Sequence, residues 1–463
     1  MENRAPPANR PGAPPLSIDS DHGIARLPRL PWTNPCAPPS RPAGEMSVLI
    51  FHPSTAPFVQ QAARALCEAR LLDRFYTTVR DDPASTSQRV ICAVGRMAGR
   101  DLRAQFRRRA VTEIPAQQVS TFPRWELLRL MVGALDREGR VTDLVWEQAE
   151  MAFDRRVAQR LHPGLRGVYG FEHSSRATFE AARERGLRVI YDVPAPETNF
   201  VQAILHRELE QHPEIRTAYH AHTAAREARR TARRHAEWHA ADLVIANSEF
   251  TKRSYVAAGL DGGKVCVVPY GAPVPAERDA ALRRDAPTGM PVFLWAGTFS
   301  IRKGAHHLLA AWREGGFGHR ARLRVFGAVT LPTRLLQPLP GGVELCGSVS
   351  REELMEEYRA ASALVFPTLC DGFGMVATEA WSRGLPVITT ECAGAVDLLR
   401  PGYNGLLVRA ADVSSLAEAL VWALAHRAEL DAMREGALAT AARWQWQDYR
   451  QALARAVSGV LAA

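Results

Sequence analysis

Short, continuously hydrophobic runs recur along the first half of this chain, and stretches with helical patterns separate them. The runs are SVLIFHP (47–53), LRVIYDVP (187–194), ADLVIANS (241–248) and KVCVVPYG (264–271). Hydrophobicity at every position, rather than at alternate positions, indicates strands that are buried on both faces of a parallel sheet. Because these strands alternate with helices, the sequence predicts βαβ units and a doubly wound α/β fold.

The alternation stops at residues 272–291, which are rich in proline and charge, and then restarts. The later runs are VFLWAGT (292–298), RLRVFGA (322–328), GVELCG (342–347), SALVFPT (362–368), LPVITTE (385–391) and GLLV (405–408). We therefore predict two Rossmann-like domains, at 46–271 and 292–440, joined by a linker at 272–291. Ligands of such folds bind beyond the carboxyl ends of the strands, so two facing sheets predict a central cleft as the binding site.

The first 45 residues hold eleven of the 31 prolines and almost no periodic apolar pattern. We predict that they form a disordered tail, because such a segment cannot bury enough surface to offset the entropy of ordering it. Met46 directly precedes the first strand run and is a candidate for the true start. The Asp19-Ser20-Asp21 segment resembles a metal-binding D-x-D motif, but its place in this tail argues against a ligand site.

A final helix is predicted from about Val413 onward, and residues 441–463 form its last part. Trp444, Trp446 and Tyr449 lie in this part. Two alternatives stay open for them: packing across to the first domain, or ordinary packing on the second.

Length, cysteines and charge limit the class of protein. A chain of 463 residues exceeds what one hydrophobic core serves, so two or three domains are expected. The seven cysteines are scattered without a C-x-x-C pair, which argues against a disulfide framework or a zinc site and predicts a cytoplasmic location. No apolar run approaches the ~20 residues that span a bilayer. The net charge of +9 admits nucleic acid, a membrane surface or a phosphorylated ligand as partner.

The stretch FPTLCDGFGMVATEAWSRGLPVITTECAG (366–394) holds two carboxylates, Asp371 and Glu379, on either side of a glycine-containing turn. Its glycines let the backbone turn tightly and approach a ligand. A helix is predicted from about Phe373 to Arg383, and its free N–H groups and dipole favour phosphate. Acids on both sides of an anion site fit the hydroxyls of a nucleotide sugar. The alternative is a helix cap at Asp371 and a solvated Glu379.

A second stretch, LWAGTFSIRKGAHHLLAAW (294–312), places Arg302 and Lys303 in the loop after the second domain's first strand. Two cations at the carboxyl end of a parallel strand can neutralise a diphosphate without metal. Gly304 keeps this turn tight. His306 and His307 follow at the start of a helix, and we interpret them as surface or packing residues.

Together these motifs resemble a family-4 glycosyltransferase of the GT-B architecture, from the glycosyl transferases group 1. The matching segments are ADLVIANSEFTK (241–252), VCVVPYGA (265–272), AGTFSIRKG (296–304), GSVSREELMEEYRAASALVFPTLCDGFGMVATEAWSRGLPVI (347–388) and PGYNGLLV (401–408). They cover most of the second domain in the expected order. The first domain resembles the family more loosely, through its strand order and HPSTAPFV (52–59).

The resemblance implies transfer of a hexosyl or related group from a UDP- or GDP-sugar to an acceptor hydroxyl, with retained configuration and without metal or other cofactor. It implies that Glu379 binds the donor ribose and that Asp371 contacts the donor sugar. Lys303, helped by Arg302, is implied to hold the diphosphate. The remaining implied donor-binding residues are Gly297, Gly372, Phe373, Gly374, Met375 and Val376.

The sequence departs from the family pattern at two places. The first acid is usually glutamate, and Asp371 is one methylene shorter, which leaves the donor sugar open. The loop after the first strand commonly carries paired glycines but here reads Pro53-Ser54-Thr55-Ala56. Ser54 and Thr55 can still donate hydrogen bonds, and we predict that they form an acceptor-side loop.

Stabilising the departing diphosphate is the main catalytic task that we expect of Arg302, Lys303 and the helix start near Gly374. The resemblance suggests that the acceptor hydroxyl passes its proton to the leaving phosphate oxygen. If a side-chain base assists, Glu172 and His173 are the candidates, because they follow a short strand in the first domain. The alternative for them is helix capping and surface hydration.

Two series of arginines recur at helical spacing in the first domain, which is the acceptor side in this architecture. The first comprises Arg226, Arg229, Arg230, Arg233 and Arg234, and the second Arg96, Arg100, Arg103 and Arg107, followed by Arg108 and Arg109. Basic helical faces predict peripheral contact with the anionic inner face of a membrane, and they suit lipid-linked or phosphorylated acceptors. The alternative is a solvated face.

We therefore predict a retaining glycosyltransferase of glycan or polysaccharide biosynthesis, with a glycan, lipid-linked or small-molecule acceptor and no nucleic-acid partner. One alternative is a GT-B nucleotide-sugar hydrolase or epimerase, which needs a well-placed base that the sequence does not show. Another is a basic nucleic-acid-binding protein. That alternative leaves the acid pair and Arg302-Lys303 unexplained, and the sequence lacks a helix-turn-helix or zinc signature.

Overall fold

The computed structural model describes residues 47–97, 102–107, 109–133, 136, 140–216, 218–278 and 289–463. The predicted tail, Met46, Arg100, Arg108 and residues 279–288 of the predicted linker lie outside the described residues.

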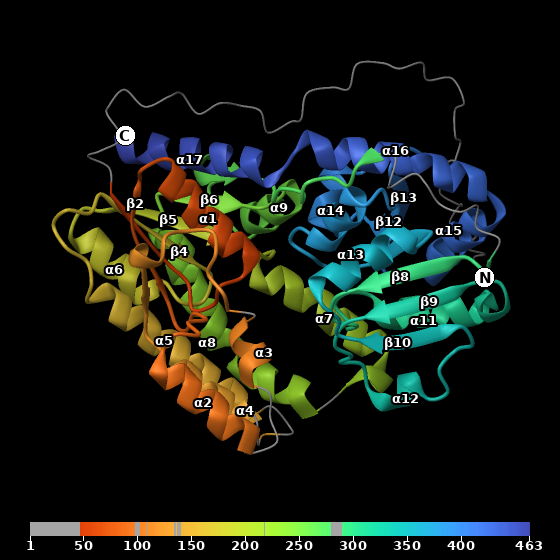
Figure 1. Cartoon of the computed structure of the whole chain (residues 1–463), viewed down its shortest axis with the longest axis horizontal. Coiled ribbons are helices and arrows are strands. Elements are labelled where there is room, and N and C mark those ends of the chain that lie inside the picture. The colour runs from red at the N-terminus through yellow and green to blue at the C-terminus, as the bar shows by residue number, and fades with distance from the viewer. Residues whose placement is uncertain are drawn as a thin grey trace, which may run out of the picture. The chain divides into compact units, whose positions relative to one another are not determined.

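The first half of the described chain forms a seven-stranded sheet of order β3-β2-β1-β4-β5-β6-β7, in which all neighbouring strands are parallel (Figure 1). Its strands are β1 (Val48–Phe51), β2 (Leu72–Thr77), β3 (Val119–Thr121), β4 (Gly167–Phe171), β5 (Arg188–Val193), β6 (Leu243–Ala246) and β7 (Val265–Val267). The hydrophobic runs predicted four of these strands, β1, β5, β6 and β7, and β4 is the short strand predicted before Glu172. They did not predict β2 and β3, which form one side of the sheet and bury only some of their positions.

The second half forms a six-stranded parallel sheet of order β10-β9-β8-β11-β12-β13. Its strands are β8 (Val292–Ala296), β9 (Arg322–Phe326), β10 (Val343–Gly347), β11 (Ala363–Phe366), β12 (Val387–Thr390) and β13 (Gly405–Val408). All six lie within the predicted runs. The two sheets confirm the prediction of two doubly wound Rossmann-like domains.

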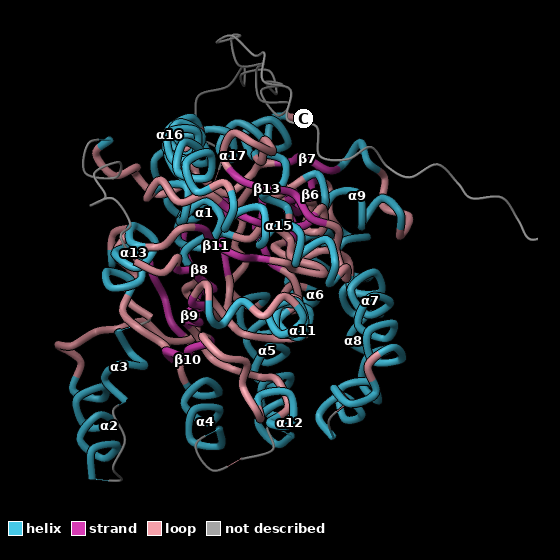
Figure 2. Tube along the Cα trace, turned by 90° about the vertical axis from the view of Figure 1, so that its right-hand side faces the viewer, coloured by secondary structure: helices cyan, strands magenta, loops and turns pink. Residues whose placement is uncertain are grey.

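Helices lie on both sides of the strands (Figure 2). Those that accompany the first sheet are α1 (Pro57–Glu68), α2 (Thr86–Met97), α3 (Leu102–Arg107), α4 (Arg124–Gly133), α5 (Arg140–Ala158), α6 (Arg176–Glu184), α7 (Thr198–Gln211), α8 (Ala218–Ala240) and α9 (Glu249–Ala257). Those that follow β8 are α11 (Ala305–Glu314), α12 (Thr333–Leu336), α13 (Arg351–Ala360), α14 (Met375–Ser382), α15 (Val413–Ala425), α16 (Arg427–Arg443) and α17 (Trp446–Ala462). Local sequence explains several starts: Pro57 opens α1, and Ser350 with Glu353 forms a capping box on α13.

The segment around α7 follows strand β5 of the first sheet but packs into the core of the second. Leu205, Leu209 and Ile215 contact a buried cluster that includes Phe293 of β8 and Leu308 of α11. Apolar residues four positions apart lie on one face of a helix, so α7 presents a hydrophobic edge to this core. The segment therefore ties the two halves of the chain together.

The predicted single helix from Val413 onward is three helices, because the chain leaves helical geometry at His426 and at Trp444–Gln445. The last helix, α17, packs against α1 of the first sheet (Figure 1). Its Arg450 donates hydrogen bonds of 2.8 Å to Glu68 and Gln61, both of α1. The end of the chain thus contacts the first sheet's helices.

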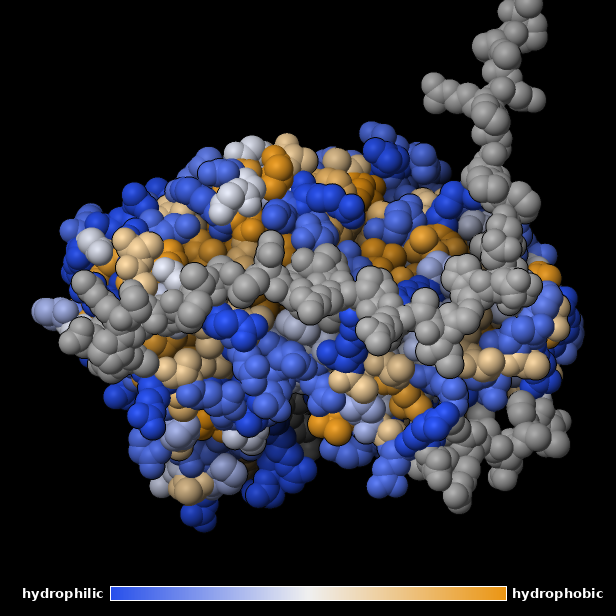
Figure 3. Space-filling view, turned by 90° about the horizontal axis from the view of Figure 1, so that it is seen from above, coloured by the Kyte–Doolittle hydropathy of each residue, from blue (hydrophilic) through white to orange (hydrophobic). Residues whose placement is uncertain are grey.

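None of the described helices combines the length and apolar character that crossing a bilayer requires. The visible parts of the face that carries α16 and α17 show hydrophobic and hydrophilic residues side by side (Figure 3).

Candidate functional site

The predicted donor-side residues follow the carboxyl ends of two neighbouring strands, β8 and β11. Gly297 comes directly after β8, and Asp371 lies in the loop after β11. Because the two strands pair in parallel, their carboxyl ends share one edge of the sheet. Topology alone therefore brings the Arg302-Lys303 loop and the Asp371 loop together.

The two predicted cations meet the first predicted acid. Lys303 Nζ lies 3.7 Å from Asp371 Oδ2, and Arg302 Nη1 lies 3.9 Å from the same oxygen. Arg302 Nη1 also donates a 2.6 Å hydrogen bond to the carbonyl of Cys370. The Lys303 side chain is 16% exposed, so it keeps little contact with water. Two cations thus surround one carboxylate, and the site favours an added anion.

Gly304 allows these two loops to pack closely. Its φ of +75° lies in the left-handed region, and a Cβ there would lie 2.0 Å from the carbonyl oxygen of Pro367. The amide of Leu369 donates a 3.0 Å hydrogen bond to the carbonyl of Arg302, which fastens the loops further. The positions of Arg302 and Lys303 are therefore set by backbone contacts with the Asp371 loop.

The turn at Gly372 contacts the first domain. Its carbonyl accepts hydrogen bonds from Ser248 Oγ at 2.5 Å and from Thr251 Oγ1 at 3.2 Å. A Cβ on Gly372 would lie 2.4 Å from the carbonyl oxygen of Pro194, which follows β5. The glycine was predicted to allow a close approach to a ligand, whereas here it allows a close approach to the backbone of the first domain.

Helix α14 begins at Met375, two residues later than predicted, because Gly374 adopts a φ of +81° as its N-cap. Among the described residues no side chain caps this helix. Asp371 Oδ1 instead accepts a 3.3 Å hydrogen bond from the amide of Phe373 inside the turn, so the alternative of a helix cap at Asp371 is wrong. Met375 and Val376 are half-buried in the first turn.

Glu379 is held inside the protein rather than in solvent. Its side chain is 19% exposed, and its carboxylate lies 3.4 Å from Arg351 Nη2 and accepts a 3.4 Å hydrogen bond from the Tyr358 hydroxyl. Burial raises the pKa of Glu379, although Arg351, Tyr358 and Lys303 act in the opposite direction. The alternative of a solvated surface glutamate is therefore wrong, and the carboxylate has few protein partners for its remaining lone pairs.

Aromatic contacts link this turn to the predicted acceptor-side loop. The ring of Phe373 lies 5.4 Å from Tyr270, and Tyr270 stacks on Phe58 at 5.3 Å. Phe58 in turn lies 6.3 Å from His52, which closes strand β1. His52 and Phe58, which lie on either side of Ser54 and Thr55 in the chain, are therefore linked through Tyr270 to the donor-side turn.

Ser54 and Thr55 themselves differ in environment. Thr55 is buried, whereas Ser54 is exposed and its amide donates a 2.9 Å hydrogen bond to His52 Nδ1. Burial lowers the pKa of His52 to about 4, so this ring is neutral near pH 7 and can accept that bond. Ser54 is the member of the pair that a ligand can reach.

The predicted base candidates, Glu172 and His173, are engaged by Arg234 of α8. Arg234 Nε lies 2.9 Å from Glu172 Oε1, and Arg234 Nη2 donates a 2.8 Å hydrogen bond to His173 Nε2. Burial, followed by Arg234, lowers the pKa of His173 well below its usual value. The Glu172 side chain is only 8% exposed, so surface hydration is wrong for it. Arg234 thus already occupies lone pairs of both Glu172 and His173, the two candidates for a base.

The first arginine series does not form a free basic face, which corrects the prediction of membrane contact or solvation for it. Arg230 pairs with Asp143 at 2.8 Å, Arg233 with Asp154 at 3.3 Å, and the arginine side chains are 13% and 16% exposed. The acids belong to α5, which packs beside α8. They recur at helical spacing (Asp143, Glu147, Glu150 and Asp154), a signal that the sequence carried and that we did not use.

This helix pair borders a pocket of about 330 Å³. Trp146, His173, Arg229 and Arg230 are among its lining residues.

In the second arginine series, Arg96, Arg103 and Arg107 are exposed on α2 and α3. Arg109, which follows them, pairs instead with Glu126 at 2.7 Å.

Comparison with known proteins gives one family match. Residues 290–426 match the family described as "Glycosyl transferases group 1". The D-inositol 3-phosphate glycosyltransferase of Nocardia farcinica is 29% identical over 240 residues, which cover 48% of this chain and 53% of that protein. The protein of the same name from Geodermatophilus obscurus is 32% identical over 228 residues, covering 45% and 50%. The chain spans about half the length of the curated relatives it matches.

Solved structures match over most of the chain. Sucrose-phosphate synthase from Thermosynechococcus elongatus aligns with a TM-score of 0.60 at 18% identity and covers 88% of this chain and 96% of that one. The HepE protein of Anabaena in complex with UDP aligns with a TM-score of 0.55 at 15% identity and covers 88% and 98%. At these identities the likeness concerns the fold, and it confirms the predicted two-domain GT-B architecture.

Proposed function

We propose that this chain, in which residues 290–426 form a domain of the Glycosyl transferases group 1 family, is a glycosyltransferase. It transfers a glycosyl group from a nucleotide-diphosphate sugar to an acceptor hydroxyl, with retained configuration and without a metal at the diphosphate. The observation that carries this proposal is the meeting of Lys303 and Arg302 with Asp371, at 3.7 Å and 3.9 Å, next to an uncapped helix start.

The cations account for the chemistry of the leaving group. Breaking the donor's glycosidic bond leaves a nucleotide diphosphate, which gains negative charge as the bond lengthens. Lys303 and Arg302 are fixed by backbone contacts and stabilise this charge without reorganising, which is the most effective form of electrostatic catalysis. The acceptor hydroxyl passes its proton to the leaving phosphate oxygen, so no side-chain base is required.

The two acids bind the hydroxyl groups on either side of the diphosphate. Glu379, which is half-buried and contacts Tyr358 and Arg351, accepts hydrogen bonds from the donor ribose. Asp371, beside Lys303, accepts from a hydroxyl of the transferred sugar. UDP is the first nucleotide to test, with GDP second, because the Anabaena HepE structures are described in complex with UDP and with UDP-glucose.

The acceptor enters from the first domain, near Ser54 and the pocket beside Trp146 and His173. Relatives named D-inositol 3-phosphate glycosyltransferase support a phosphorylated acceptor, and glycan or lipid-linked acceptors fit the same side. Peripheral contact with an anionic membrane is proposed only for the exposed Arg96, Arg103 and Arg107 of α2 and α3.

The competing functions lose their support. Nucleic-acid binding through α8 requires free arginines, but Arg230, Arg233 and Arg234 are paired with buried acids. Hydrolysis or epimerisation requires a free base, but His173 Nε2 already accepts a hydrogen bond.

A thermal-shift screen against nucleotides and nucleotide sugars, followed by product analysis with the best donor, tests the proposed function. We expect one nucleotide family to raise the melting temperature in a saturable way, since a ligand that binds only the folded state stabilises it. We expect NMR of the product to show the donor's anomeric configuration and turnover to proceed without added Mg²⁺ or Mn²⁺. Absence of any nucleotide-dependent shift would overturn the proposal.

Replacing Glu379 with glutamine is expected to weaken binding of the donor nucleotide by about 10- to 100-fold, which corresponds to loss of a hydrogen bond to a charged group. The isosteric amide keeps the volume and a partner for Tyr358, so the melting temperature without ligand should change little. Isothermal titration of the nucleotide measures the effect. Glu356→Gln, on the exposed face of α13, is the matched control, and equal affinity in the two variants would contradict the ribose assignment.

A further inference from the structure

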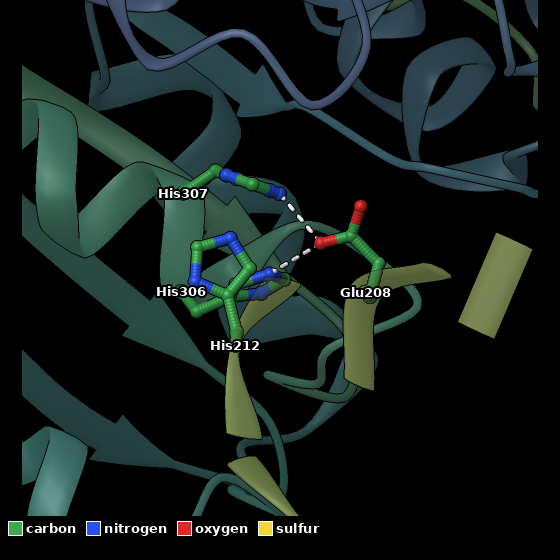
Figure 4. A group of neighbouring side chains, drawn as sticks. All are labelled: Glu208, His212, His306 and His307. Atoms are coloured by element: carbon green, nitrogen blue, oxygen red, sulfur yellow. Dashed lines mark hydrogen bonds and ion pairs between the residues drawn. The ribbon is translucent and has the colours of Figure 1, made fainter. Parts of the chain in front are cut away.

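Four potential metal ligands meet where the α7 segment contacts α11 (Figure 4). Glu208 lies on α7 and His212 directly follows that helix, whereas His306 and His307 open α11. Glu208, His306 and His307 are buried, with 2%, 8% and 5% of their surface exposed. The sequence interpretation of the two histidines as surface or packing residues missed this cluster, because its two halves are far apart along the chain.

The ligand atoms converge closely. Nε2 of His306 and Nε2 of His307 each lie 2.8 Å from the same oxygen, Oε2 of Glu208. The ring of His212 lies 5.3 Å from that of His306 and 5.5 Å from that of His307. One ligand atom from each of the four residues can be chosen so that all lie within 4.8 Å of one another.

We propose that Glu208, His212, His306 and His307 bind a divalent transition metal ion of the zinc class, which fastens the α7 segment to the start of α11. Three imidazoles and one carboxylate are a donor set suited to zinc, whereas magnesium and calcium prefer all-oxygen sites. Ligands on a tetrahedral zinc ion with bonds of about 2.0–2.1 Å lie about 3.4 Å apart. The two Nε2–Oε2 distances of 2.8 Å and the 4.8 Å limit for all four ligand atoms are close enough to that value for small side-chain movements to complete the geometry.

A metal ion explains this cluster better than hydrogen bonding does. In the hydrogen-bonded arrangement, Nε2 of His306 and Nε2 of His307 both depend on one oxygen of a single buried carboxylate, Oε2 of Glu208. Among the described residues, Nδ1 of His306 has no hydrogen-bond partner. Hydrogen bonding thus leaves this buried ring partly unsatisfied, whereas a cation at the point where the ligand atoms converge balances the buried Glu208 carboxylate.

A contact with Glu214 orients His212, the proposed ligand that lies just after α7. Nδ1 of His212 lies 3.3 Å from Oε1 of Glu214, which leaves Nε2 for the metal. A carboxylate on the far nitrogen of a histidine fixes its ring and strengthens it as a ligand.

The position of the site suggests a structural role that is separate from the proposed chemistry. Helix α11 begins directly after Arg302, Lys303 and Gly304, so its first turn supports the loop that carries the cations. The α7 segment already packs into the second core through Leu205, Leu209 and Ile215. A metal ion at this contact joins a segment that follows β5 to a helix that follows β8.

Titration of metal ions into the purified full-length chain, stripped with a chelator, tests the proposal without requiring any substrate. We expect one Zn²⁺ per chain by isothermal titration, a higher melting temperature with Zn²⁺ but not with Mg²⁺, and visible ligand-field absorption of a tetrahedral site with Co²⁺. Glu208→Gln keeps volume and hydrogen-bonding capacity, so it should fold as the unmodified chain does. It should lose more zinc affinity than the ~10- to 100-fold that follows loss of an outer-shell partner.

His307→Ala should also lose zinc affinity. His426→Ala, which removes an exposed histidine just after α15, is the control and should bind zinc normally. Failure of the unmodified folded chain to bind Zn²⁺ would overturn the proposal. Zinc binding of equal strength in the unmodified chain, Glu208→Gln and His307→Ala would also overturn it, because the metal would then sit elsewhere. Neither result depends on whether the chain transfers sugars.

Discussion

Replacing Lys303 with alanine is expected to lower turnover by about 100- to 1,000-fold, the loss that follows removal of one preorganised donor from a developing anion. Lys303 lies 3.7 Å from Asp371, its side chain is largely shielded from water, and its Nζ lies 5.5 Å from the centre of the Phe366 ring. A cation in such a place acts at low effective dielectric and is not replaced by solvent. Steady-state kinetics with the donor found by the screen measures the effect.

The same variant should leave acceptor affinity nearly unchanged, because the acceptor side lies in the first domain. Arg313→Ala, which removes an exposed cation from α11, the helix that follows the Lys303 loop, is the matched control and should keep full turnover. Lys303→Arg keeps the charge and should recover part of the rate, although its planar group fits the site differently. Normal turnover in Lys303→Ala would refute the role of this residue at the diphosphate.

The sequence predicted most of the fold because the parallel sheets leave a local signal. The central strands of the second sheet, β8 (VFLWA) and β11 (ALVF), are hydrophobic at every position and almost fully buried, as expected for strands covered on both faces. In β2 (LDRFYT) polar residues interrupt the apolar ones, and β3 (VST) has only one apolar residue, so neither produces such a run. The two missed strands lie together on one side of the first sheet.

The candidate site was predictable where it depends on strand ends and not where it depends on distant partners. The meeting of Lys303 with Asp371 follows from the parallel pairing of β8 and β11. The hydrogen bonds from Ser248 and Thr251 to Gly372, in contrast, join α9 of the first domain to a loop of the second domain. The arginines of α8 were misjudged for a similar reason, because their partners on α5 are about 80 positions away in the chain.

The histidine cluster shows the same limit for metal sites. Cysteine spacing gave a local argument against zinc, and that argument concerns only ligand sets carried by one short segment. Glu208 and His212 are spaced to share a helix face, and His306 and His307 are adjacent, but each pair alone is too small to form a site. Packing of α7 against the second core brings the two pairs together.

Replacing Gly304 with alanine is expected to destabilise the chain by about 2–5 kcal/mol, from about 1–2 kcal/mol for a left-handed alanine and about 1–3 kcal/mol for overpacking. The added Cβ would lie 2.0 Å from the carbonyl oxygen of Pro367, which is backbone and cannot move aside as a side chain does. Relief of this contact must separate the Arg302-Lys303 loop from the Asp371 loop. We therefore expect weaker nucleotide binding together with lower stability.

Gly316→Ala, beyond the other end of α11, separates the two causes. Gly316 also has a positive φ, +57°, but a Cβ there would meet nothing within 4 Å. This variant should lose only the stability that a left-handed alanine costs, about 1–2 kcal/mol, and it should bind nucleotide normally. Urea unfolding and nucleotide titration of both variants measure the difference. Equal destabilisation and equal nucleotide affinity would mean that contact with Pro367 does not position the cations, and the proposed anion site would then need another explanation for its geometry.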